Sequence, residues 1–233
     1  MKIIFSPTKT MEYSSNLGAT EPIFIAKAKK IITDLQKLSD EDLNKIWKVS
    51  PKLFLEAKAN LLASDFNHTS AALFSYNGIS FKYLDPKSLD AEGLDYLNSH
   101  LRILSGLYGV LKPTDKIINY RLEMNYAKRI WLDSISKEFE SDDYIINLAS
   151  NEYSQMLEKY NIPLITIIFY RDKNGKLKEE STESKMMRGR FLRYLALNQI
   201  EDVASLKDIE LEGYTYRSEL SDSHKIAFVK KVY

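Results

Sequence analysis

Cysteine is absent from this chain of 233 residues. Its absence excludes structural disulfides, thiolate catalysis, and zinc or iron–sulfur sites held by cysteine. Histidine is scarce as well. The chain has 3 histidines, His68, His100 and His224, and no two of them stand at the i, i+4 spacing of a helical metal site. We therefore expect no metal site and no bound cofactor.

The chain also lacks an excess of positive or negative residues, and it lacks long apolar runs. The 33 basic and 32 acidic residues leave a net charge of +1, which argues against coating nucleic acid through bulk charge but permits a local basic cleft. No apolar run approaches the roughly 20 residues of a membrane span. The first apolar run stops at Pro7 and is too short for a signal sequence. We expect a cytoplasmic protein that does not associate with membranes.

Apolar residues make up 44% of the chain, enough for a sizeable core. Short continuous apolar runs predict buried strands at residues 3–5, 71–76, 144–148 and 164–170. Apolar residues at helical spacing, with start signals, predict helices at residues 22–38, 40–49, 51–63 and 182–197. Residues 210–216 and 225–232 alternate like two exposed edge strands. Without repeats or linkers, this order predicts an α/β (mixed α+β) fold, a single domain over residues 1–233 with one mixed sheet flanked by helices.

The stretch from residue 100 to residue 124 combines an apolar run with glycines and anion-binding side chains. The run at residues 101–104 leads into Gly106 and Gly109, and glycine is favoured where the backbone turns tightly or a ligand approaches closely. Lys112 and Arg121 follow, with Tyr120 beside the arginine. The stretch is either an anion site or an ordinary tight turn with solvated lysines.

Polar residues follow three of the apolar runs. Lys9 comes shortly after residues 3–5, and the run at residues 101–104 ends at Gly106. The run at residues 144–148 contains Asn147 and is followed by a third polar group made up of Ser150, Asn151 and Glu152. Ligands of open α/β sheets bind beyond the carboxyl ends of the strands. These side chains either line one crevice or belong to plain strand-to-helix connections.

One of the four basic residues in the predicted helix at residues 182–197 lies on its apolar face. The four are Lys185, Arg188, Arg190 and Arg193. At about 100° per residue, Arg188 falls inside the apolar arc, while Lys185 lies at its edge. An arginine that faces the core must be paired or must face a polar cavity, because burying it alone is prohibitive. Arg188 therefore meets a carboxylate such as Glu123 or Glu152, or it lines the crevice.

Four motifs in the same order resemble one known family over most of the chain. They are IIFSPTKTMEY near the N-terminus, HLRILSGLYGVLKP at residues 100–113, INLASNEY at residues 146–153, and KMMRGRF at residues 185–191. Together they resemble the YaaA family of bacterial peroxide-stress proteins. The resemblance implies a single-domain mixed α/β fold, a positively charged cleft, and binding to double-stranded DNA. It also implies a helix-hairpin-helix-like element over residues 101–112, although the usual Gly-hydrophobic-Gly turn has one extra residue here.

Two hypotheses about function follow. In the first, the protein binds duplex DNA without sequence preference during the peroxide response, and the resemblance links it to limiting free intracellular iron. Cations would hold phosphates, and the turn from Gly106 to Gly109 would present backbone amides. These cations are Lys9, Lys112, Arg121, Lys185 and Arg188. In the second, the same cleft is an active site for a nucleobase or nucleotide, with Lys9 and Glu152 as candidate proton-transfer groups. Under either hypothesis a base could stack on Tyr108, Tyr120 or Tyr153. No feature identifies a protein partner.

Overall fold

The central part of the fold is a block of five parallel strands. The computed structural model describes residues 1–158, 160 and 163–232. Within them, nine strands form one sheet, and its main path runs β4-β3-β1-β6-β7-β11-β10-β9. The parallel strands are β3 (Leu101–Ser105), β1 (Lys2–Phe5), β6 (Ile145–Leu148), β7 (Leu164–Lys173) and β11 (Lys225–Lys231). The predicted α/β fold with a mixed sheet is confirmed.

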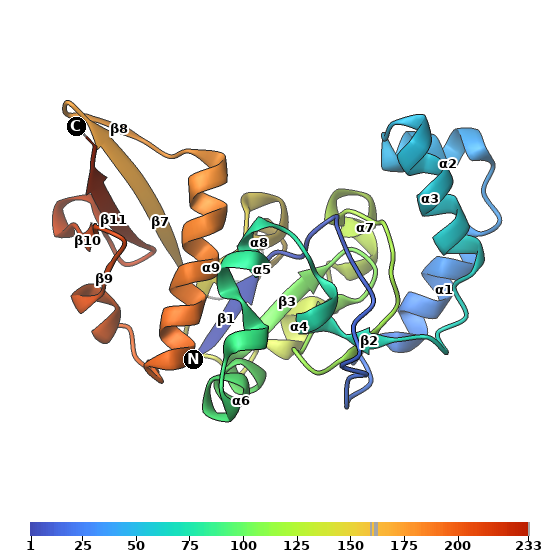
Figure 1. The fold of residues 1–233 in the computed structure, drawn as a ribbon, viewed down its shortest axis with the longest axis horizontal. Helices are drawn as coiled ribbons and strands as arrows, with labels where there is room; N and C mark the ends of the chain where they lie inside the picture. Colours follow the sequence, from blue (N-terminus) through green and yellow to red (C-terminus); the bar gives the residue numbers. More distant parts are fainter. Residues whose placement is uncertain (159, 161–162, 233) are drawn as a thin grey trace.

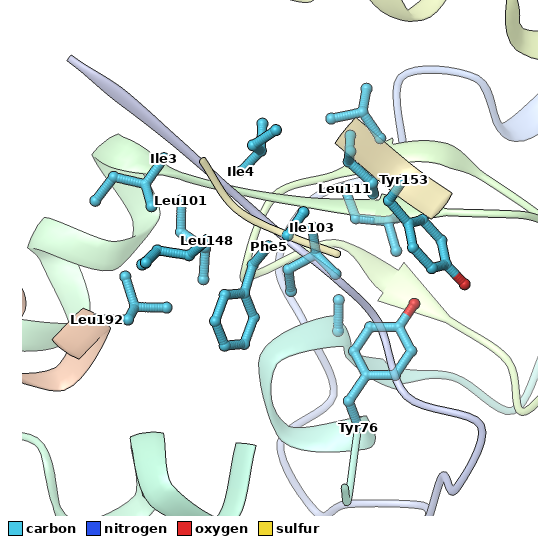
Figure 2. Packing of buried hydrophobic residues seen from close by; sticks show 14 of the residues in the cluster. Ile3, Ile4, Phe5, Tyr76, Leu101, Ile103, Leu111, Leu148, Tyr153 and Leu192 are labelled. Atoms are coloured by element: carbon cyan, nitrogen blue, oxygen red, sulfur yellow. The ribbon is translucent and has the colours of Figure 1, made fainter. Parts of the chain in front are cut away.

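Helices cover both faces of the parallel strands, which is why these strands read as continuous apolar runs. In Figure 1, α5 (Ile79–Leu84), α6 (Ala91–His100) and α9 (Ser181–Leu197) lie in front of the sheet, and α7 (Met124–Trp131) and α8 (Asn151–Glu158) lie behind it. Figure 2 shows core side chains gathered around β1, among them Ile3, Phe5 and Leu148.

Antiparallel strands complete the sheet at its margins. β4 (Gly109–Leu111) closes one edge, β10 (Tyr214–Tyr216) and β9 (Glu210–Leu211) close the other, and β8 (Lys176–Lys178) forms a hairpin with β7. The prediction that residues 225–232 form an exposed edge strand is wrong. β11 lies between β7 and β10, and its residues from Ile226 to Val229 are buried. Flanking lysines gave this strand its alternating, edge-like appearance.

The helix-hairpin-helix-like element predicted over residues 101–112 is absent, because that segment folds as a β-hairpin. β3 and β4 pair antiparallel, with Ser105 opposite Gly109. β3 is also hydrogen-bonded to β1 and is buried along its whole length, so tertiary pairing decides its structure. Gly109 has φ of +74°, the left-handed conformation that this turn requires.

Residues 71–76 were predicted as a strand but are mostly helical. Ser70 and Ala71 form the short strand β2 (Ser70–Ala71), which pairs with β5 (Lys116–Ile117), and α4 (Ala72–Ser75) follows at once. The Ser75 hydroxyl donates to the Ala71 carbonyl at 2.9 Å and helps to close this turn. A short apolar run is compatible with a strand or a buried helix, and here the helix is formed.

Three helices near the N-terminus lie at one end of the molecule, away from β7 to β11 (Figure 1). They are α1 (Ile25–Leu35), α2 (Asp40–Trp47) and α3 (Pro51–Leu62), and all three were predicted. The Ser39 hydroxyl caps α2, and Pro51 begins α3. Short 3₁₀ turns complete the described elements at Pro86–Ser88, Ile135–Glu138, Ser205–Asp208 and Ser218–Leu220. Over the described ranges, no helix has the length and hydrophobicity needed to cross a bilayer.

Candidate functional site

A pocket of about 390 Å³ lies where β1 and β6 end. β1 leads into a loop that carries Lys9, and β6 leads into Ser150 and α8. Because β1 and β6 are adjacent and parallel, their carboxyl ends lie at the same edge of the sheet. The beginning of α5, one side of α9 and the segment 120–123 complete the wall. The charged side chains that line the pocket are Lys9, Arg121, Glu123, Glu152, Lys185 and Arg188.

Serine hydroxyls join the two strand ends. The Ser150 backbone amide donates to the Ser6 hydroxyl at 2.8 Å, and the two hydroxyl oxygens lie 3.2 Å apart. The loop after β1 also packs closely on the start of α5, where a Cβ added to Gly78 would lie 2.4 Å from the Thr8 side chain. These contacts hold Lys9, which follows Thr8, at the mouth of the pocket.

One glycine in α9 brings two cations to the pocket. A Cβ at Gly189 would lie 2.1 Å from the backbone oxygen of Ser80, so α9 packs with its backbone directly against α5. Arg188, the preceding residue, lines the pocket with only 16% of its side chain exposed. Its guanidinium lies 3.5 Å from a carboxylate oxygen of Glu179. Burial lowers the pKa of Arg188, and Glu179 opposes that effect. Lys185, one turn earlier, is exposed on the same wall.

The other two arginines of α9 have structural partners. The Arg190 guanidinium lies 4.7 Å from the Tyr83 ring centre and 2.9 Å from Glu212. Arg193 donates to the carbonyls of the last turn of α5, at 3.0 Å to Leu84 and 2.9 Å to Asp85. Both therefore attach α9 to its surroundings, and both lie outside the pocket lining.

Two carboxylates face the pocket from the other side of the sheet. Glu123 directly precedes α7 and forms an ion pair with Lys9. Glu152 lies in the first turn of α8, and burial followed by the nearby Glu123 charge raises its pKa, against the opposing effects of the Asn125 amide and Lys9. The Glu152 Oε1 atom is buried and has no hydrogen-bond partner among the described residues. A protonated or ligand-bound Glu152 would satisfy this oxygen.

The segment 120–123 packs directly against Gly106, where the absence of a side chain leaves room for it to reach the pocket. A Cβ at Gly106 would lie 2.4 Å from the Leu122 carbonyl oxygen, and the Trp131 indole donates to the Gly106 carbonyl at 2.8 Å. Arg121 thereby lines the pocket, although its buried Nε has no partner in the described structure. The Tyr120 hydroxyl lies 2.7 Å from Ser105 Oγ, and burial raises its pKa to about 12.

The structure brings together six of the residues proposed for anion binding or catalysis, one of which is Ser150. Lys9, Arg121, Lys185, Arg188 and Glu152 all line the pocket. Their functional roles remain predictions. Glu123 and Glu152 do not pair with Arg188, which uses Glu179 instead.

The remaining candidates lie outside the pocket lining. Asn147 uses its side chain within the sheet, accepting from the Ala149 amide at 2.8 Å and donating to Thr166 at 3.1 Å. Tyr108 is fully buried and accepts from the Ile118 amide, so its ring is not available to a base. Asn151 is exposed at the start of α8.

The remaining residues of the central stretch have other positions. Gly106 and Gly109 pack against the segment 122–123 and the Trp131 ring, and their turn does not line the pocket. Lys112 follows β4 at the opposite end of the parallel strands, where it lines a separate pocket with Arg102 and Asp115.

Sequence reasoning missed the contribution of residues 78–80 at the start of α5. Gly78 and Ser80 line the pocket, but the Asn77-Gly78 pair looked like an ordinary turn. The KMMRGRF motif held a usable signal, since a glycine within a strongly helical segment indicates close packing of another backbone. In the part of the chain that the structure describes, no group of three or more His, Asp or Glu side chains is arranged to hold a metal ion.

Comparison with known proteins identifies the family. The family described as "Peroxide stress protein YaaA" matches residues 1–220. A UPF0246 protein of Lactobacillus delbrueckii subsp. bulgaricus is 36% identical, with 99% of this chain and 100% of the relative covered. A UPF0246 protein of Finegoldia magna is 37% identical, with 100% and 99% covered, and one of Clostridioides difficile is 35% identical, with 99% and 100% covered. As the four sequence motifs predicted, the chain belongs to the YaaA family of peroxide stress proteins.

Proposed function

We propose that this protein binds duplex DNA through the sugar-phosphate backbone at the pocket beyond β1 and β6, as part of the cellular response to hydrogen peroxide. The observation that carries the proposal is the convergence of four cations from three separate segments of the chain on one pocket. They are Lys9, Arg121, Lys185 and Arg188. Phosphate contacts from such side chains give affinity without sequence preference. As the family resemblance implies, we place this role in a cytoplasmic response that also limits free iron.

The charge balance supports an anionic ligand. Two carboxylates, Glu123 and Glu152, line the pocket with the four cations; Glu123 is paired with Lys9, and Glu179, outside the lining, is paired with Arg188. Lys185 is exposed, and the described residues provide it with no ion pair, so it is free to meet a phosphate. The hydroxyls of Thr10 and Ser80 add neutral donors along the same wall, whereas the Thr8 hydroxyl donates to the Thr10 carbonyl at 2.7 Å.

A matched pair of lysine variants tests the proposal. Lys185→Ala removes a cation from the pocket, whereas Lys112→Ala removes one from the opposite end of the strands. Duplex affinity is measured by fluorescence anisotropy at several salt concentrations. We expect Lys185→Ala to weaken binding to all sequences and to flatten the slope of log affinity against log salt by about one unit. Lys112→Ala should leave that slope unchanged. Equal slopes in the two variants would refute the assignment of the pocket.

An enzyme that acts on a nucleobase or nucleotide is the second candidate. The observation in its favour is the unpartnered Oε1 of Glu152, because a buried carboxyl group with a raised pKa is typical of proton-transfer sites. Glu152→Gln keeps the shape and removes one charge. A plain phosphate-binding site should then bind DNA equally well or slightly better, and cells should survive peroxide as before. Normal DNA binding with lost survival, in a folded variant, would favour the enzyme.

A further inference from the structure

The pocket has two chemically different ends and an apolar floor. α9 and α5 provide the first wall, with Arg188 and Lys185 facing the cavity. The start of α8 and the segment 120–123 provide the opposite wall, with Glu152, with Arg121 and with Glu123, which is ion-paired to Lys9. Phe5, Leu148 and the other apolar side chains lie between them. Figure 2 shows Phe5 and Leu148 close together beside β1.

A phosphodiester backbone uses only part of this arrangement. Phosphates need cations and hydroxyls, and they gain nothing from an apolar floor. A carboxylate placed beside them repels them. A pocket of about 390 Å³ also falls in the size range of small-molecule sites, which combine apolar walls with a few placed polar groups.

Two buried polar atoms without partners indicate which hydrogen-bonding groups an occupant of the pocket would supply. Arg121, which lines both this pocket and a smaller cavity beside it, has an Nε donor without a partner among the described residues, and that donor calls for a hydrogen-bond acceptor. Glu152 Oε1 is equally unpartnered in the described structure, and as a carboxylate oxygen it calls for an N–H or O–H donor. An occupant with an anionic group and a separate N–H donor on a flat apolar body meets both requirements.

We propose that the pocket binds a single nucleotide, with its phosphate at Lys185 and Arg188 on the α9 wall and with an N–H group on the edge of its base donating a hydrogen bond to Glu152. The nucleotide is either free or an unpaired unit of a DNA strand, since both present the same chemistry. This occupant is proposed for the same pocket as the proposed DNA binding. It depends on DNA binding only if the nucleotide is part of a DNA strand, and a free nucleotide would bind without it.

Free nucleotides give the first test. Isothermal titration calorimetry compares dAMP and dGMP with the 5′-monophosphate of purine deoxyriboside, whose base has the same rings but no N–H donor. We expect at least one of the two natural nucleotides to bind about tenfold more tightly than the analogue. In Glu152→Gln, whose amide nitrogen can present a donor where the acceptor stood, that ratio should fall towards one. Lys112→Ala serves as the control, and it should retain the full ratio.

DNA gives the second test and separates the two sources. A perfect duplex is compared with duplexes that carry one bulged dA, dG or purine deoxyriboside. Tighter binding of bulged dA or dG than of the bulged analogue, with no binding of free nucleotides, assigns the pocket to unpaired units of DNA. A preference among free nucleotides alone assigns it to free nucleotides, even if perfect duplex is not bound.

The remaining outcomes are refutations. Binding of perfect duplex with no preference in either test would overturn the single-nucleotide pocket and leave the proposed DNA binding standing. Failure to bind duplex, bulged duplex and mononucleotide alike would overturn both. If the preference survives unchanged in Glu152→Gln, the glutamine amide oxygen is still able to accept the base N–H. Glu152→Met, which has no oxygen to accept it, is then the deciding variant, and an unchanged ratio there would remove Glu152 from base recognition.

Discussion

The contact between α5 and α9 makes a quantitative prediction for Gly189→Ala. The new Cβ would lie 2.1 Å from the Ser80 carbonyl oxygen and 3.0 Å from the Leu84 amide nitrogen, both of them backbone atoms. Real Cβ contacts are not that short, so the two helices must move apart or the backbone must shift. Overpacking of this kind costs about 3 kcal/mol. Alanine has a higher helix propensity than glycine, and this difference stabilises the folded state by about 1 kcal/mol.

The free energy of unfolding should therefore fall by about 2 kcal/mol in Gly189→Ala, which lowers Tm by roughly 4–8 °C in a chain of this size. Gly93→Ala in α6 is the matched control. Its Cβ would meet only side-chain atoms, namely the Asp90 carboxylate that caps α6 through the Gly93 amide, at 3.2 Å, and Leu89 at 3.3 Å, so a shift of a few tenths of an ångström is enough to accommodate it. We expect Gly93→Ala to stay within about 1 kcal/mol of the wild type. Guanidinium denaturation and thermal melting measure both variants.

The same substitution should also affect function, because α9 presents Lys185 and Arg188 to the pocket. Gly189→Ala should lose affinity for DNA at a temperature where the variant is still folded, whereas Gly93→Ala should not. Equal stability of Gly189→Ala and Gly93→Ala would show that the close approach of α5 and α9 is not a requirement of the fold.

Three further predictions concern charged side chains and a turn. Glu138→Gln should lower the free energy of unfolding by about 3–5 kcal/mol in denaturant titrations, because it leaves Arg102, whose side chain is 6% exposed, without its carboxylate. Burial raises the pKa of Glu152 above its value in the unfolded chain. The protonated carboxyl group therefore favours the folded state below pH ~4, and this contribution to stability is lost as the pH rises and the group ionises. Glu152→Gln should have the same free energy of unfolding as the wild type at low pH and a higher one near neutral pH. Gly109→Ala should destabilise the fold by more than 1 kcal/mol in thermal melting, because φ is +74° and the new Cβ would lie 2.8 Å from the Trp131 ring.

The strand ends were predictable because parallel strands share a direction. Once residues 3–5 and 144–148 are recognised as neighbouring buried strands, the side chains after them must lie at one edge. Lys9, Ser150 and Glu152 meet there for that reason. Asn147 was misplaced because it lies within β6, where its amide is used by the Ala149 backbone and by Thr166 of the next strand.

The central stretch was harder to interpret, because its structure depends on residues far away in the chain. β3 forms beside β1, and β4 closes on β3, so partners about 100 residues distant decide that this segment is extended. The glycines look like a ligand-binding turn in sequence. In the structure they make room for Leu122 and for the Trp131 ring, and they therefore act on the pocket only through the segment that carries Arg121.

The basic residues of α9 show why charge alone does not locate a binding site. Lys185, Arg188, Arg190 and Arg193 occupy one helix, and their side chains have similar reach. Arg190 and Arg193 are used by Tyr83, Glu212 and the end of α5. Helical periodicity placed Arg188 on the apolar arc with Lys185 at its edge, but it could not supply the distance between α9 and α5. That distance is set by Gly189, and it decides that Arg188 reaches a cavity rather than a packed core. The shape of this pocket is therefore specified as much by Gly189, which has no side chain, as by the cations beside it.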